Sequence, residues 1–283
     1  EKMSAKDFTR NLNSRKGLPF HPEFIDKIEA ERGFAFGGQQ RQAFQLLRST
    51  GFKLLTGDPG TGKTTTVNGL LKYLEMLWDS EYGKSPVFAL CAPAGRAAQR
   101  MKETTNRNAL TIHKLIEYQP YGANEYYKDA NDPIEADVIV VDEVSMLGLS
   151  TFSKLINAIK NGTLVLLVGD TNQLQSVEPG NVLHDIIASQ CVDRCHLSEV
   201  FRQAEESLIN QNAKKIIRGE EDLLTGDDFQ IQKCTKENIQ DTLKEVIYQL
   251  LLECNDSKKI QALAPVKKGS CGVKEGNVII QQL

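Results

Sequence analysis

The chain has 283 residues, of which 40% are hydrophobic and 25% are charged. This length is enough for one large domain and part of a second, because domains usually have roughly 100–200 residues. The formal net charge of −3 excludes nucleic-acid binding through bulk charge, so any contact with phosphate backbones requires a local basic surface.

The first part of the chain alternates between helical and strand-like patterns. Residues 1–36 are polar and irregular apart from an amphipathic stretch at 22–32, and we interpret them as a leader or the end of a preceding domain. A helical pattern at 39–48 follows, and helical patterns such as 65–78 and 151–160 separate later apolar runs. Those short runs, each ending in glycine, proline or an acid, are 52–56, 87–91, 138–141 and 164–168. This alternation predicts an α/β fold with a mainly parallel sheet, whose ligands sit beyond the carboxyl ends of the strands.

The second part of the chain begins with a change of pattern near residue 199. Helical stretches at 207–218 and 236–253 precede a strand-like run at 260–264. We therefore expect a first α/β domain over residues 37–198 and part of a second over 199–283. Residues 117–136, polar and rich in tyrosine, form an insertion in the first domain that is long for a simple connection.

No apolar run approaches the roughly 20 residues that a membrane helix needs, so we expect no membrane contact. The six cysteines are scattered, and Cys191, Cys195 and His196 form their one cluster. No second ligand pair stands at zinc-site spacing. The cysteines therefore favour reduced thiols in a cytoplasmic protein over a metal site.

A glycine-rich segment follows the first predicted strand and fits the pattern G-x-x-x-x-G-K-[ST]. Glycines let backbone N–H groups surround phosphates, and the N-terminus of the following helix adds positive charge. Lys63 supplies a point charge for the β- and γ-phosphates, and the Thr64 hydroxyl is a Mg²⁺ ligand. A chance glycine-rich turn is disfavoured, because a strand precedes the segment and a helix follows it. The predicted ATP-binding residues are Gly57, Asp58, Pro59, Gly60, Thr61, Gly62, Lys63, Thr64 and Thr65.

Polar residues also end two later strands. Asp142 and Glu143 follow the run 138–141, and we predict that Asp142 holds Mg²⁺ while Glu143 orients and deprotonates the attacking water. Gln173 follows the run 164–168 and is an uncharged group suited to sensing a γ-phosphate. An ordinary helix start and a well-capped turn are the structural alternatives for these two places.

Four segments in this order resemble the ordered motifs of superfamily 1 helicases: 57–64, 142–146, 169–174 and 200–203. Finer similarities indicate the RecD/TraA branch, also described as the exodeoxyribonuclease V alpha-subunit family. Residues 92–98 are similar to its segment A-P-T-G-R-A-A, 111–115 to T-I-H-x-L, and 176–183 to S-V-G-P-G-N-V-L. The resemblance covers about residues 38–283.

This resemblance implies a RecA-like domain 1A at 37–198, a small 1B-type insertion at about 117–136 that acts as a duplex-splitting pin, and a partial domain 2A at 199–283. It implies that Gln40 reads the adenine edge, that Gln173 couples the γ-phosphate to DNA, and that Arg202 stabilises charge on the transferred phosphoryl group. The implied single-strand track consists of Pro93, Ala94, Gly95, Arg96, Thr111 and His113.

The chain also differs from that family pattern. Ala94 replaces the usual threonine, Gln175 a proline and Glu178 a glycine. The later motifs, including a second γ-phosphate arginine, are not in the sequence. We therefore do not expect this chain alone to unwind DNA.

Basic residues suggest where a phosphate backbone would bind. Between Arg96 and Lys114 there are five basic residues and one acid, which is the expected local footprint, although a solvated helix face is the alternative. Lys267 is a further candidate contact in the second domain. Tyrosines at 118, 121, 126 and 127 either stack on bases or pack on the core.

The expected function is that of an ATP-dependent DNA helicase motor fragment, which by resemblance moves 5′ to 3′ on single-stranded DNA. Its expected partners are single-stranded DNA, duplex junctions, and subunits of a recombination or conjugation complex. The alternative is a nucleotide-gated single-stranded-DNA-binding module without motor activity. A small-molecule kinase or unrelated P-loop switch is disfavoured by the order of Glu143, Gln173 and Arg202.

Overall fold

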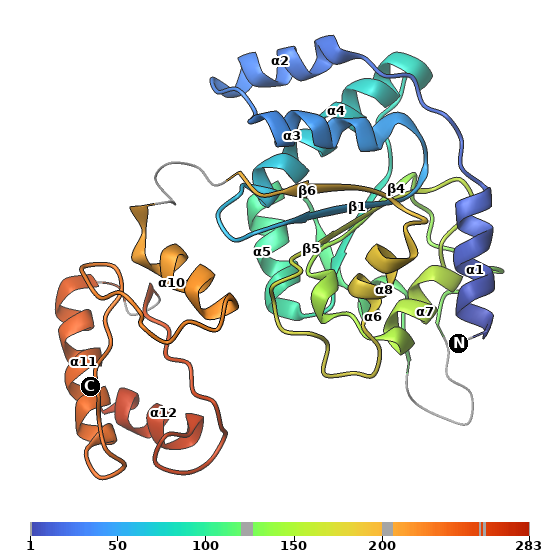
Figure 1. Ribbon diagram of the computed structural model, residues 1–283. Coiled ribbons are helices and arrows are strands. Elements are labelled where there is room, and N and C mark those ends of the chain that lie inside the picture. The colour runs from blue at the N-terminus through green and yellow to red at the C-terminus, as the bar shows by residue number, and fades with distance from the viewer. Residues whose placement is uncertain (1, 120–126, 200–205, 255, 257–258, 283) are drawn as a thin grey trace. The chain divides into compact units, whose positions relative to one another are not determined.

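Six strands form one sheet in which every neighbouring pair is parallel (Figure 1). The structure is a computed structural model that describes residues 2–119, 127–199, 206–254, 256 and 259–282. The order is β3-β2-β4-β5-β1-β6. The strands are β1 (Gly51–Gly57), β2 (Phe88–Ala92), β3 (Ala109–Thr111), β4 (Val138–Val141), β5 (Leu164–Gly169) and β6 (Asp193–Leu197). The predicted α/β fold with a mainly parallel sheet is confirmed.

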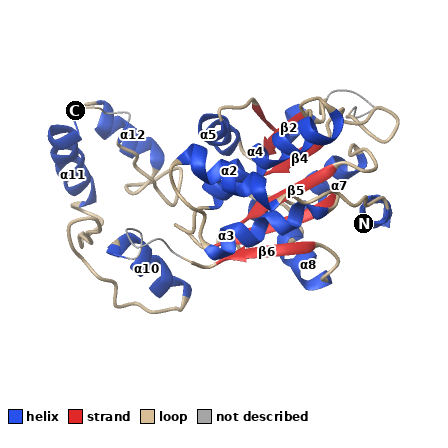
Figure 2. Cartoon of the chain, turned by 90° about the horizontal axis from the view of Figure 1, so that it is seen from above, coloured by secondary structure: helices blue, strands red, loops and turns tan. Residues whose placement is uncertain are grey.

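Helices cover both faces of this sheet (Figure 2). In chain order the described helices of the sheet-containing unit are α1 (Lys2–Asn13), α2 (Pro22–Arg32), α3 (Gly38–Ala43), η1 (Phe44–Arg48), α4 (Lys63–Tyr82), α5 (Gly95–Thr105), α6 (Ile112–Leu115), η2 (Val144–Met146), α7 (Leu149–Asn157), α8 (Val182–Ser189) and α10 (Leu208–Ile217), of which α10 does not belong to either apolar cluster on the sheet. Together with the sheet they belong to one compact unit, Glu1–Asp222.

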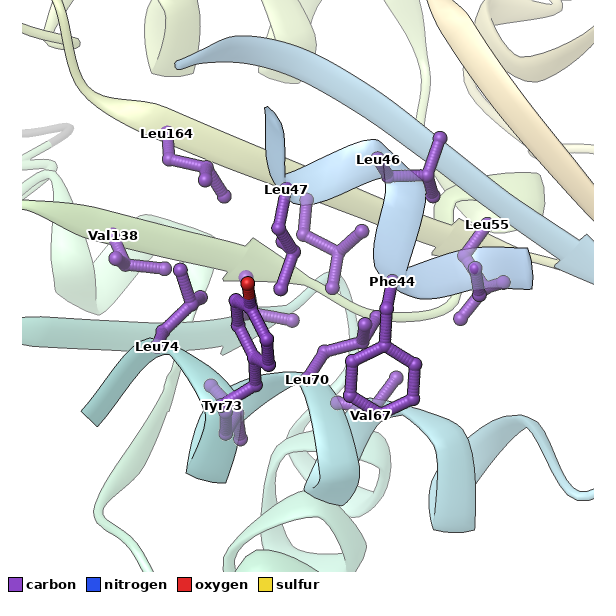
Figure 3. Close-up of a cluster of buried hydrophobic side chains, with 14 of the residues drawn as sticks. Phe44, Leu46, Leu47, Leu55, Val67, Leu70, Tyr73, Leu74, Val138 and Leu164 are labelled. Atoms are coloured by element: carbon purple, nitrogen blue, oxygen red, sulfur yellow. The ribbon is translucent and has the colours of Figure 1, made fainter. Parts of the chain in front are cut away.

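The core is divided by the sheet into two apolar clusters. Because side chains alternate along a strand, Val138 and Val140 of β4 face the first cluster, whereas Ile139 and Val141 face the second. Helices α2, α3 and α4 pack on the first cluster, where the ring of Tyr73 lies among leucines (Figure 3). Helices α6, α7 and α8 pack on the second. Burial on both faces explains why the strands read as continuous apolar runs.

The N-terminal segment is more ordered than its sequence suggested. The prediction of an irregular segment is wrong at its beginning, where α1 lies, whereas the amphipathic stretch predicted at 22–32 coincides with α2. The Phe8 ring of α1 lies 4.7 Å from the ring of Phe52 in β1, and the Tyr73 hydroxyl accepts a hydrogen bond from the backbone N–H of His21. A few contacts of aromatic side chains thus hold mostly polar helices against the rest of the unit. Hydrophobic periodicity in the sequence does not reveal a helix such as α1, which is held by so few apolar residues.

Residues Leu223–Leu283 form a second compact unit. Its described helices are α11 (Ile239–Cys254) and α12 (Val273–Gln281). The predicted strand at 260–264 is absent: its described backbone has no regular structure, and Leu263 is 85% exposed. No described residue of this unit belongs to a named strand, so the run has no sheet to join. Among the helices described in either unit, none has the length and hydropathy to cross a membrane.

Candidate active site

The loop between β1 and α4 has the backbone shape of a phosphate cradle. Gly60 and Gly62 have φ values of 78° and 77°, in the left-handed region that favours glycine. A Cβ atom at Gly57 would lie 2.8 Å from Thr61 Oγ1 and 2.9 Å from Leu197 Cβ. Gly60 and Gly62 are therefore required by their backbone conformation, and Gly57 is required because a side chain has no room there, as the motif predicts.

Lys63 begins α4, and its ammonium group is held inside this loop. It donates to the carbonyl oxygens of Gly57 and Asp58 and, at 3.1 Å, to the Asp170 carboxylate. The Asp170 side chain is only 1% exposed. Sequence reasoning did not place Asp170 among the site residues, although it ends β5 just as Asp142 ends β4.

The two acids lie at the carboxyl end of β4. Glu143 has φ 55°, a left-handed conformation that is uncommon outside glycine and concentrates at functional sites. Burial raises the pKa of Asp142, and burial followed by the neighbouring Asp142 charge raises the pKa of Glu143. The charge of Lys63 opposes both increases.

These groups converge on one cavity of about 380 Å³. The P-loop, the two acids and Gln173 all line it. The full lining is Asp58, Pro59, Gly60, Gly62, Lys63, Thr64, Val67, Ala97, Arg100, Met101, Thr104, Thr105, Asp142, Glu143, Val168, Asp170 and Gln173. The Thr64 hydroxyl and the Asp142 carboxylate offer the oxygen ligands that Mg²⁺ prefers, so the residues present fit this ion.

Three predicted nucleotide residues, Gly57, Thr61 and Thr65, lie outside the lining. Gln40 is also outside it and is 3% exposed. Its amide donates to the Thr61 carbonyl at 3.2 Å and accepts from the Gly37 N–H at 3.0 Å. Both ends of this side chain therefore bind the chain itself and fix the segment before α3 to the P-loop.

A neighbouring glutamine, Gln39, makes contacts that the sequence did not reveal. Its side-chain oxygen accepts from the backbone N–H groups of Ser198 and Glu199 at 2.6 Å and 3.0 Å. Its amide nitrogen donates to the Ser198 hydroxyl. Gln39 thus fixes the chain where β6 ends, a few residues before Arg202, which lies outside the described residues.

A second cavity, of about 640 Å³, shares Gln173 with the first, and we refer to it as the groove. Its lining is Pro93, Ala94, His113, Met146, Leu147, Gly148, Thr151, Gln173, Leu174, Gln175, Ser176, Val177 and Glu178. Leu174 and Val177 are 90% and 104% exposed, so apolar side chains stand open to solvent here. Gln173 lines both cavities, and its side-chain oxygen lies 3.5 Å from the Ser145 hydroxyl.

The structure brings only some of the predicted DNA-binding residues to this groove. Pro93, Ala94 and His113 line it, whereas Gly95 and Arg96 are exposed at the start of α5 outside the lining. The Thr111 hydroxyl caps α6 by accepting from the Lys114 N–H at 3.3 Å. Lys267 belongs to the second unit.

Glu178, which departs from the family pattern, fills space in the groove. Its carboxylate accepts a hydrogen bond from the Thr151 hydroxyl at 3.0 Å, and its backbone N–H donates to Ser176 Oγ. A Cβ atom at Gly148 would lie 2.3 Å from the Glu178 Cβ. The glutamate is therefore accommodated by a glycine opposite it and places a carboxylate on the groove wall.

The basic run and the tyrosines divide between structural and open positions. Arg107 pairs with Glu75 at 2.7 Å and lies over the Phe88 ring, so it is used within the fold. Tyr118 and Tyr127 pack against the second core cluster, which supports the packing interpretation for both. The other two tyrosines of the insertion lie outside the described residues.

Comparisons with known proteins indicate the family of this chain. A family model described as "AAA domain" matches residues 35–238. The "ATP-dependent RecD2 DNA helicase" of Deinococcus radiodurans is 34% identical over 249 residues, which cover 87% of this chain and 33% of that protein. The "RecBCD enzyme subunit RecD" of Mycolicibacterium smegmatis is 38% identical over 165 residues, which cover 53% of this chain and 30% of that protein.

Among solved structures, the Pif1 helicase from Candida albicans aligns with a TM-score of 0.48 and 18% identity. The alignment covers 76% of this chain and 54% of that one. The chain spans about a third of the length of the curated relatives just described. The family match and these sequence similarities show that the chain belongs to the AAA-domain family and to its RecD-type superfamily 1 helicases.

Proposed function

We propose that this chain carries the ATP-hydrolysing site of a DNA helicase and that hydrolysis drives movement along single-stranded DNA. The observation that carries the proposal is the position of Gln173, which lines both the triphosphate cavity and the groove. The similarity to a protein named an ATP-dependent DNA helicase supports it. Movement 5′ to 3′ is part of the proposal and rests on the family resemblance.

In the proposed reaction the P-loop binds and orients the triphosphate. Lys63 leaves the Asp170 carboxylate and contacts the β- and γ-phosphates, while the loop N–H groups surround them. Thr64 and Asp142 would hold Mg²⁺, which supplies charge neutralisation at the phosphates when bound. Glu143 orients a water molecule and accepts its proton, for which its carboxylate must be ionised.

The groove is the proposed track for the DNA strand. Its open apolar residues Met146, Leu174 and Val177 offer contacts to bases and sugars. His113 adds a polar contact. Arg96 extends the predicted backbone contacts beyond the lining, at the exposed start of α5. Subunits of a recombination or conjugation complex are proposed further partners, since one relative is named as a RecBCD subunit.

The direct test is steady-state ATP hydrolysis by this chain, and by a longer chain with the later motifs, with and without oligo-dT. We expect DNA to raise turnover and Lys63→Ala to abolish it, because the phosphates lose their main positive charge. Lys84→Ala removes an exposed lysine outside both cavities and should leave turnover unchanged. Equal turnover in Lys63→Ala and the unmodified chain would place the activity elsewhere.

The alternative is a nucleotide-gated DNA-binding module without motor activity. The second unit favours it, because its described residues contain two helices and no named strand. This alternative predicts that ATP changes the affinity for oligo-dT while hydrolysis stays negligible. Unwinding of a forked duplex by the longer chain would exclude it.

A further inference from the structure

One face of α5 forms a wall of the triphosphate cavity. The side chains that line it recur at helical spacing, as expected for a single face. They are Ala97, Arg100, Met101, Thr104 and Thr105. Arg100 is the ionisable member of this face, so the basic run read from the sequence places a cation at the nucleotide site.

Within the described residues, the Arg100 side chain has no hydrogen bond or ion pair, and the residue is exposed. Its surroundings are nevertheless acidic. Arg100 lines the same cavity as the carboxylates of Asp142 and Glu143. The guanidinium is therefore a cation at the same site as both acids.

The side chains that line the cavity carry more negative than positive charge. Its carboxylates are Asp58, Asp142, Glu143 and Asp170, and its cations are Lys63 and Arg100. Four negative and two positive groups leave a net charge of −2 before a triphosphate enters. Lys63 is already paired with Asp170 at 3.1 Å. Arg100 is then the cation of this lining that no described carboxylate holds.

We propose that Arg100 is a phosphate-binding residue whose guanidinium contacts the terminal phosphate of ATP from α5. The inference rests on the proposed ATP-binding function and adds a cation supplied by the same unit as the P-loop. An arginine suits this place, because its planar fork binds two phosphate oxygens at once and stays ionised. Charge that spreads over the terminal phosphoryl oxygens during transfer would be stabilised by the same contact.

The test measures binding rather than turnover. Affinities of the unmodified chain, Arg100→Ala and Arg100→Lys are compared for fluorescent ADP and a fluorescent non-hydrolysable triphosphate analogue, with Mg²⁺ and without DNA. Arg100→Ala should weaken triphosphate binding about 10- to 100-fold, as expected for a charge-assisted hydrogen bond. It should weaken ADP binding by less than about 2-fold, since ADP lacks the contacted group. The triphosphate affinity of Arg100→Lys should lie between those of the unmodified chain and Arg100→Ala, because lysine keeps the charge and loses the planar, two-pronged guanidinium.

Arg194→Ala is the matched control. It removes an exposed arginine from β6 that lines neither cavity, and both affinities should stay unchanged. Equal weakening of ADP and triphosphate binding by Arg100→Ala, or no weakening, would overturn the inference while leaving the proposed function intact. Failure of the unmodified chain to bind either nucleotide would overturn both.

Discussion

An ion pair between the buried Lys53 of β1 and the half-exposed Asp193 of β6 tests how this unit is stabilised. The Lys53 side chain of β1, the strand next to the edge strand β6, is 0% exposed. Its ammonium donates to the Asp193 carboxylate at 2.6 Å and to Ser49 Oγ at 2.7 Å. Arg15 adds a longer contact of 3.4 Å to the same carboxylate. Asp193→Ala would leave a buried charge with a single hydroxyl partner.

The expected loss of stability follows from that geometry. Breaking a fully buried pair costs about 3–5 kcal/mol, since the remaining charge stays desolvated. The Asp193 side chain is 50% exposed, so water screens part of the interaction. We therefore expect Asp193→Ala to lower the free energy of unfolding by about 2–3 kcal/mol. In a unit of this size, that corresponds to a fall in Tm of roughly 4–12 °C.

Lys53→Met is the informative partner variant. It removes the charge together with its desolvation penalty and keeps a similar volume, so its stability should be close to that of the unmodified chain or higher. The double variant should then resemble Lys53→Met. The assay is urea unfolding followed by circular dichroism at pH 7 and low salt. A loss below about 0.5 kcal/mol for Asp193→Ala, the usual scatter of a surface substitution, would refute the reasoning.

The pH dependence of the same variant provides a second check. The hydrogen bond from Lys53 lowers the pKa of Asp193 below its ordinary value of 3.8. A carboxylate with a lowered folded-state pKa contributes stability that is complete above its unfolded-state pKa and is lost as the pH falls through the folded-state pKa. The stability difference between the unmodified chain and Asp193→Ala should therefore be constant above about pH 5 and shrink toward pH 3. A constant difference down to pH 3 would contradict this account.

Three further predictions concern the site and the thiols. Turnover should rise with pH through an apparent pKa above 4.5, because burial raises the pKa of Glu143 and the base acts when ionised; in a pH–rate profile, an apparent pKa at or below 4.5 would contradict this. Gly62→Ala should weaken ATP binding, measured by fluorescence titration, because a left-handed φ of 77° costs roughly 1–2 kcal/mol with a Cβ atom; unchanged affinity would show that the loop adapts. Burial raises the pKa of the Cys91 thiol, so a thiol reagent followed by mass spectrometry should label the exposed Cys191 and Cys234 first, whereas early labelling of Cys91 would reveal local opening.

The sequence identified the elements whose pattern is set by burial. The four buried strands of the centre, such as β4 at Val138–Val141, coincide with their predicted runs within about one residue at each end, because both faces of each strand are covered. The P-loop was also predictable, since its glycines and Lys63 have to occur at fixed spacing to surround phosphates. These features depend on residues that are close together in the sequence, so the sequence alone predicts them.

Other features depend on contacts between distant segments and could not be read in advance. Strand β6 (Asp193–Leu197) lies at the edge of the sheet, and several of its side chains are exposed. Because its sequence includes charged residues, it does not form an apolar run that would predict a strand. Gln39 and Asp170 act through partners about 160 and 107 positions away. Sequence spacing carries no information about such pairs, so the site residues predicted from motifs omitted both, although the position of Asp170 directly after a buried strand was a usable signal.

The link between the two cavities lies in the short segment that follows β5. Its first residue, Asp170, holds Lys63, and Asn172 donates to the Asp58 carboxylate at 2.9 Å, so this end is bound to the P-loop. Its other end, from Leu174 to Glu178, lines the groove. A triphosphate that draws Lys63 away from Asp170 changes the contacts of a segment whose far end is the groove wall. Coupling between sites requires an element that both sites bias, and this segment contacts both within nine residues. We therefore propose that nucleotide state reaches the groove through this segment rather than through the apolar core.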